Sequence, residues 1–188
     1  MIGLKAEAIR FAEDLAGKLA EGGAAKAIWE GVSDCSEHKR ISGYVIEVLD
    51  PLVHDLVKDG WLPKDAKGRF DWEGRNRPRG ELQEHSYFLL GTGAHPDAAV
   101  LEPFTVAFEF DREPAKPDTA HFKACLMKAA VHVLCGAYDA TVFIYTLTRK
   151  GSTANTYIDD PDDPACTHQL LRTLRGHGLV VQFVGRSP

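Results

Sequence analysis

The sequence predicts an α/β protein with a mixed sheet flanked by helices. Residues 140–147 form a β-branched, aromatic run that is bounded on both sides, which is typical of a central strand. Before it, apolar residues recur at helical spacing over 119–136, which predicts a crossover helix and a parallel strand pair. Two short apolar runs flank Glu102-Pro103, a turn-like dipeptide. We therefore expect a sheet that is hairpin-like at that turn and parallel beyond it.

The first elements along the chain are expected to be helices. Apolar residues at helical spacing over 2–21 predict an amphipathic helix that ends at Gly22-Gly23. A second helical pattern covers residues 41–56 and contains Pro51. This helix is either kinked at Pro51 or restarts there, with Asp50 as its cap.

The middle of the chain changes from loop to strand. Residues 63–80 are rich in Gly, Pro and charge, which predicts a loop or irregular hairpin. Residues 85–90 (HSYFLL) are expected to form the first strand of the core, bounded by a Gly-Thr-Gly turn. The runs AAVL and FTVAF, on either side of Glu102-Pro103, follow as two further strands.

The C-terminal part adds a loop, a helix and a strand. Residues 152–164 are polar and acidic, 166–176 have a helical pattern, and 179–184 (LVVQFV) form a last strand. No internal repeat or linker divides the chain, so residues 1–188 are expected to be one domain. Within it we expect an N-terminal helical extension (1–40), a core (41–148) and a C-terminal loop, helix and strand (149–188).

Composition limits the class of protein. The chain has 44% hydrophobic and 26% charged residues, as in ordinary globular proteins, and its formal charge of −5 allows only a local nucleic-acid-binding surface. Charged residues near the N-terminus argue against a signal peptide, and no apolar run is long enough to cross a bilayer. We therefore expect a cytoplasmic protein without membrane contact. The four cysteines are expected to be reduced and buried; a zinc site from Cys35, His38, Cys166 and His168 matches no strong spacing.

Three carboxylates mark the predicted hairpin. Asp97 precedes the first of its strands, and Glu109 and Asp111 follow the second apolar run. Residues two apart on a strand share a face, and the Glu102-Pro103 connection would fold Asp97 back alongside them. Carboxylates gathered in this way repel one another unless a cation lies among them, and oxygen ligands suit Mg²⁺ or Mn²⁺.

This order of elements and acids resembles the PD-(D/E)xK nuclease superfamily, which includes many restriction enzymes. That family has an αβββαβ core with Pro-Asp at the start of the second strand and (Asp/Glu)-x-Lys on the third. Pro96-Asp97 and Glu109 match these positions, and the likeness covers roughly residues 41–148. The resemblance implies a restriction-endonuclease-like fold over this core, with a metal-dependent catalytic site.

One position departs from the family pattern. The slot for the family's lysine holds Asp111. Asp111 is then either a third metal ligand in a lysine-free variant, which we favour, or the mark of a lost activity. Lys123 or Lys128, on the following helix, could supply a displaced cation, whereas Lys116 is expected in a loop. We assign catalytic roles to Asp97, Glu109, Asp111 and Lys123.

The resemblance also implies which residues would bind the metal. Asp97 would bridge the metal, and Glu109 and Asp111 would be its partners. Glu47 on the preceding helix is a possible fourth acid, although we favour its interpretation as an ordinary boundary residue of an amphipathic helix. Two histidines are possible general bases. His95 adjoins the acids, whereas His132 lies on an apolar helix face and is expected to be a core residue.

Affinity for DNA would come from lysine and arginine contacts to phosphates. The candidates are loop cations that could flank a duplex: Arg75, Arg77, Arg79, Arg149 and Lys150. The first three could instead belong to a solvated loop.

The sequence thus predicts a Mg²⁺-dependent DNA endonuclease of the restriction type, acting as a homodimer so that both strands are cut. The alternative is a catalytically inactive nuclease-fold module for nucleic-acid binding or protein assembly, favoured by Asp111 in the lysine slot and by the acidic net charge. A third possibility is an unrelated α/β fold whose acids are incidental.

Overall fold

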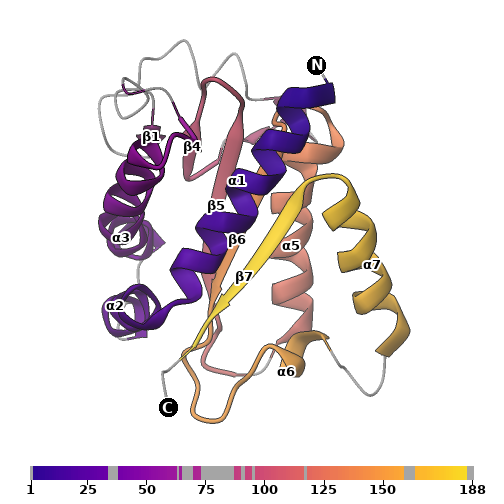
Figure 1. The fold of residues 1–188 in the computed structure, drawn as a ribbon. Coiled ribbons are helices and arrows are strands. Elements are labelled where there is room, and N and C mark those ends of the chain that lie inside the picture. Colours follow the sequence, from indigo (N-terminus) through magenta and orange to yellow (C-terminus); the bar gives the residue numbers. More distant parts are fainter. Residues whose placement is uncertain are drawn as a thin grey trace.

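A five-stranded mixed sheet forms the centre of the protein (Figure 1). The computed structural model describes residues 2–33, 38–62, 64, 70–72, 87–89, 92–94, 96–116, 118–158 and 164–185. The strands lie in the order β1-β4-β5-β6-β7. Their bounds are β1 (Phe70–Trp72), β4 (Ala98–Val100), β5 (Val106–Arg112), β6 (Ala140–Thr146) and β7 (Leu179–Val184).

The strand directions confirm the predicted mixed sheet. β4 pairs with β5 antiparallel, with Ala98 opposite Phe108, across the segment that contains Glu102-Pro103. β5 pairs with β6 in parallel through the helix α5 (Thr119–Leu134), and β6 pairs with β7 in parallel. The hairpin therefore supplies one half of the sheet and the crossovers supply the other.

Helices cover both faces of the sheet (Figure 1). One face packs against α1 (Ile2–Ala20), α2 (Gly22–Ser33) and α3 (His38–Lys58), and its core includes Phe11 and Phe108. The other face packs against α5, the short α6 (Asn155–Ile158) and α7 (Pro164–Gly176). Burial on both faces explains why β6 is apolar at nearly every position rather than alternating.

The core on the α5 side is aromatic. Phe122 of α5 packs against rings from three other elements, with centroid distances of 5.0 Å to Tyr145, 5.1 Å to Tyr157 and 5.5 Å to Phe183. All four rings belong to the core on this side of the sheet. These contacts fix the rotation of α5 about its axis, and therefore which of its side chains face β5.

The N-terminal part of the sheet differs from the prediction. Residues 87–89 form strand β2, but β2 pairs with β3 (Thr92–Ala94) in a separate two-stranded sheet. The strand beside β4 is β1, at 70–72, inside the segment expected to be a loop or irregular hairpin. Which strands pair depends on contacts distant in sequence, and β1 and β3 lie in segments rich in turn-forming residues, so the sequence pattern could not place them.

Two helices also differ from the expectation. The chain forms α2 directly after α1, because Gly22 and Gly23 begin a new helix rather than a loop. α6 lies within the acidic segment expected to be a loop. α3 continues through Pro51 as one helix, which excludes the alternative of a restart at that residue. None of the helices that the structure describes is both long and apolar enough to cross a membrane.

Candidate functional site

Asp97, directly before β4, lies opposite Glu109 of β5. The register pairs Ala98 with Phe108, so the preceding position, Asp97, faces Glu109. The Asp97 backbone N–H donates to the Phe108 carbonyl at 3.0 Å, and its Oδ2 accepts from the Phe110 N–H at 2.8 Å. Both acids are 3% exposed. The register therefore places these two residues side by side, while the Asp97 carboxylate is bonded to the backbone of β5 and that of Glu109 to side chains of α5.

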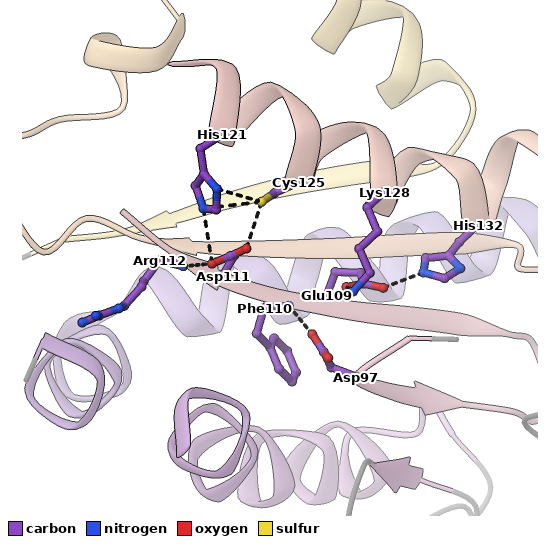
Figure 2. A network of polar contacts seen from close by, with 9 residues as sticks. All are labelled: Asp97, Glu109, Phe110, Asp111, Arg112, His121, Cys125, Lys128 and His132. Atoms are coloured by element: carbon purple, nitrogen blue, oxygen red, sulfur yellow. Dashed lines mark hydrogen bonds and ion pairs between the residues drawn. The ribbon is translucent and has the colours of Figure 1, made fainter. Parts of the chain in front are cut away.

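A polar stripe on α5 faces the acids of β5. It consists of His121, Cys125, Lys128 and His132, spaced four, three and four residues apart, which places them on one side of the helix. α5 joins two parallel strands and therefore runs back along β5. Figure 2 shows the result: the first two members of the stripe point to Asp111 and the last two to Glu109.

Glu109 is held at both of its oxygens. Lys128 Nζ donates to Oε2 at 2.7 Å, and His132 Nε2 lies 2.7 Å from Oε1. A carboxylate only accepts hydrogen bonds, so the Nε2 of His132 carries the hydrogen. His132 is fully buried, as expected of a core residue, but it is bonded to the candidate site rather than only packed.

Lys128 connects the exposed surface to the acids. Half of its side chain is exposed, while its amino group contacts the buried Glu109. Burial by itself would lower the pKa of Lys128, but the negative charges of Glu109, Asp97 and Asp111 outweigh this and raise it. Lys128 is therefore a fixed cation in contact with one acid and within electrostatic reach of the other two.

Asp111 has a different set of partners. Its Oδ2 accepts from the Cys125 thiol at 2.9 Å, and its Oδ1 lies 3.6 Å from His121 Nε2. The Arg112 backbone N–H also donates to Oδ1 at 2.7 Å. Burial, and then the hydrogen bond and charge of Asp111, raise the pKa of the Cys125 thiol, which keeps its proton. The Arg112 guanidinium bonds to the carbonyls of Val32 and Ser33 instead of to Asp111.

Two kinds of possible metal ligand therefore lie on or beside β5. Asp97 and Glu109 offer oxygen donors of the kind that hard cations prefer. Asp111, His121 and Cys125 offer oxygen, nitrogen and sulfur, and their ligand atoms all lie within 4.8 Å of one another. Among the described residues, only this second set has three possible ligands so close together.

Lys123 does not occupy the position expected of a catalytic cation. It follows His121 by two residues, which is a rotation of about 200° around the helix, so it lies on the other side of α5 from the polar stripe. The lysine that contacts Glu109 is Lys128, the other candidate on this helix. The lysine in contact with Glu109 therefore lies five residues further along the chain than the lysine to which we assigned a catalytic role.

The remaining predicted site residues lie apart from this cluster or outside the described residues. Glu47 is on the exposed face of α3. Arg149 forms an ion pair with Glu113 at 2.7 Å, and Lys150 is exposed. Five of the predicted residues lie outside the described part of the chain: Cys35, Arg75, Arg77, Arg79 and His95. Three more lie in described helices, but their side chains are not described: His38, Cys166 and His168.

His121 and Cys125 were missed as functional candidates. Their signal was present in the sequence as a polar stripe with helical spacing, but an apolar helix with scattered polar residues has many such pairs. Cys135, expected to be buried, is exposed at the C-cap of α5. His121 and Cys125 are distinguished from other polar residues of α5 only by their position opposite the acids of β5.

The chain was compared with known proteins in three ways. A scan against protein-family models, a search of curated proteins and a search of solved structures each gave no match. What the site can do is therefore inferred from its own geometry and chemistry.

Proposed function

We propose that this chain is a metal-dependent endonuclease that hydrolyses DNA phosphodiester bonds, with a restriction-endonuclease-like fold in which Lys128 replaces the lysine of the PD-(D/E)xK motif. One observation carries the proposal: Lys128 Nζ lies 2.7 Å from Glu109 Oε2, and Asp97 faces Glu109 across the β4–β5 pair. A lysine that reaches the motif acid from the next helix would supply the charge that Asp111 cannot.

The order of elements supports this assignment. From α3 onward, the elements of the main sheet and its helices run α3, β1, β4, β5, α5 and β6, with β1, β4 and β5 antiparallel and β5 and β6 parallel. This order agrees with an αβββαβ core. The acids lie at the start of its second strand and on its third.

Two residues would hold the metal. Asp97 and Glu109 are buried carboxylates at opposed positions of the hairpin, and such oxygens fit Mg²⁺ or Mn²⁺. When bound, the ion would lower the pKa of a water and neutralise charge on the phosphate. Asp111 lies two residues further along β5, where its carboxylate is bonded to Cys125. It is therefore a less suitable ligand for this ion than we expected.

The chain's own groups would do the rest. The ammonium group of Lys128 can donate to a phosphate oxygen or to the attacking water while it stays beside Glu109. His132 holds the Glu109 carboxylate from the buried side, and therefore fixes the direction of its oxygens. DNA would be bound through loop cations, and cutting of both strands would need two copies of the chain.

A second candidate function is a nuclease-fold module without catalysis, which binds nucleic acid or assembles with protein. The favouring observation is that both oxygens of Glu109 already contact protein groups. Lys128 would then neutralise the acid in place of a metal. Such a module would bind DNA in the presence of Mg²⁺ without cutting it.

Plasmid cleavage tests the proposal. The wild-type chain should nick or cut plasmid DNA with Mg²⁺ or Mn²⁺, and Asp97→Ala should abolish this. Lys128→Met should lower the rate by at least about 100-fold, because a charge that stabilises the transition state is lost. Lys123→Met is the matched control, since it removes a lysine from the other side of the same helix, and its rate should stay within about twofold of wild type.

The outcomes separate the two candidates. Cleavage that survives Asp97→Ala would come from a contaminant or another site and would exclude the proposal. Binding of DNA without cleavage by either metal would favour the inactive module. Equal losses in Lys123→Met and Lys128→Met would contradict the role given to Lys128.

A further inference from the structure

We propose that Asp111, His121 and Cys125 form a binding site for one zinc-class metal ion, separate from the carboxylates that face Lys128. The three side chains come from two elements, β5 and α5, and meet at one point on the α5-facing side of the sheet (Figure 2). This site does not depend on nuclease activity.

The distances are close to those of a tetrahedral site. Bonds of about 2.0–2.3 Å to zinc give separations of roughly 3.3–3.8 Å between neighbouring ligand atoms. His121 Nε2 lies 3.6 Å from Cys125 Sγ and 3.6 Å from Asp111 Oδ1. The sulfur lies 2.9 Å from Asp111 Oδ2, and this pair would open by several tenths of an ångström around an ion. Nε2 is therefore the ligand atom of the imidazole.

The ligand types select the metal. Thiolate and imidazole groups favour zinc and similar ions over Mg²⁺ and Ca²⁺, which prefer oxygen alone. On binding, the ion takes the place of the thiol proton that Cys125 now donates to Asp111, and this proton passes to solvent. Three protein ligands leave a fourth position for water, which is the arrangement of open zinc sites.

The scaffold holds the ligands in place. His121 and Cys125 are one helical turn apart, and the residues beside them, Phe122 and Leu126, are fully buried in the aromatic core. The His121 backbone N–H donates to the Asp118 carboxylate at 2.9 Å, which fixes the first turn of α5. Asp111 is oriented by the Arg112 N–H. Little rearrangement is needed for binding.

An ion can also reach the site. The side chain of His121 is 37% exposed and that of Asp111 is 25% exposed, so the cluster opens to solvent. Asp111 lies two residues, about 7 Å, from Glu109 along one face of β5. An ion at Asp111 would therefore be a fixed positive charge beside the candidate hydrolytic acids.

Zinc binding by the reduced, metal-free full-length chain tests the site. Isothermal calorimetry with Zn²⁺ alone should give one ion per chain. Cys125→Ser and His121→Gln should each weaken binding by at least about tenfold. Cys135→Ser is the matched control, because it removes a second thiol from the same helix at an exposed position, and its affinity should equal that of wild type.

Cobalt identifies the ligand and covers the case of a variant that folds poorly. Co²⁺ bound to the wild type should show sulfur-to-cobalt charge-transfer absorption, retained in Cys135→Ser and absent from Cys125→Ser. His121→Gln changes a partly exposed side chain, and should weaken the binding with an unchanged circular dichroism spectrum. No zinc binding by the wild type would overturn the proposal, as would cobalt–sulfur absorption that persists in Cys125→Ser. Because no step involves cleavage, failure here leaves the proposed nuclease function untouched.

Discussion

Two buried glutamates four residues apart, Glu109 on β5 and Glu113 just after it, have opposite surroundings. Glu113 lies at 1% exposure and accepts from the segment that follows β6. Its donors are the Arg149 backbone N–H at 2.8 Å, the Arg149 guanidinium at 2.7 Å, and the hydroxyl groups of Ser152 and Tyr157. Glu109 instead faces α5 and shares its surroundings with other acids.

The balance of charge distinguishes the two regions. Glu113 is one anion with one guanidinium and several neutral donors, so its charge is fully compensated. Burial raises the pKa of Tyr157 to about 12, and the bond to Glu113 adds to this, so its hydroxyl remains a donor. Around Glu109, one ammonium group, that of Lys128, lies near three carboxylates. A balanced cluster stabilises the fold, whereas an excess of buried negative charge favours binding of a cation.

The largest expected effect is on stability at Glu113. Glu113→Ala should lower the free energy of unfolding by about 3 kcal/mol, because it removes one partner of a buried ion pair and leaves Tyr157 without its acceptor. Urea denaturation measures this, with Glu30→Ala as the control, since Glu30 is exposed in an i,i+4 pair and should cost under about 0.5 kcal/mol. Equal effects of the two changes would remove the distinction between a structural and a surface acid.

A smaller effect is expected from pH on the contribution of Glu113 to stability. Burial alone would raise the pKa of Glu113, but its hydrogen bonds from Arg149, Ser152 and Tyr157 outweigh burial and lower it. The resulting stabilisation is present above the unfolded pKa of about 4.3 and is lost as pH falls through the folded value. The difference in stability between wild type and Glu113→Gln should therefore narrow below about pH 4. Urea denaturation at a series of pH values measures it, and a gap that widens on acidification would contradict this account.

The smallest effect on stability is expected at Lys128. Lys128→Met should lower the free energy of unfolding at neutral pH by less than Glu113→Ala does, because half of the Lys128 side chain is exposed and solvent screens its side of the ion pair. The pKa of Lys128 is raised, so the contribution of the pair is present below about pH 10.4 and is lost only as pH rises through the folded value. Thermal denaturation at low and high salt measures it. A loss as large as that of Glu113→Ala would make Lys128 a structural residue like Arg149.

Much of the fold could be predicted because long elements carry a clear period. The bounds of the crossover helix and of the strands at 140–147 and 179–184 were predicted to within a residue or two. The antiparallel pairing of the two runs around Glu102-Pro103 was also predicted. β2 was given the wrong partner because strand pairing depends on contacts distant in sequence, and β1 and β3 were missed because they lie in segments rich in Gly and other turn-forming residues. α2 was missed because two glycines usually end a helix and here begin one.

The residues of the candidate site also divide into those that the sequence identified and those that required the packing of the helices. The sequence identified Asp97 and Glu109 as neighbours, because the hairpin and the period of a strand fix which residues share a face. It identified Lys128 only as one of two helical candidates, and chose Lys123 instead. Choosing between them requires the rotation of α5, and that rotation is set by the packing of Phe122 against rings from β6, α6 and β7.

The sequence by itself therefore determined the acids and the elements that carry them, since both follow from local periodicity. Only the tertiary structure decided their partners. It assigned Lys128 and His132 to Glu109, and it gave Asp111 to His121 and Cys125 instead of to a shared cluster of three carboxylates. The physical reason is that a helix packed on a sheet turns one stripe of its side chains toward the sheet, and which stripe this is depends on the packing of Phe122 against aromatic residues as distant in sequence as Phe183.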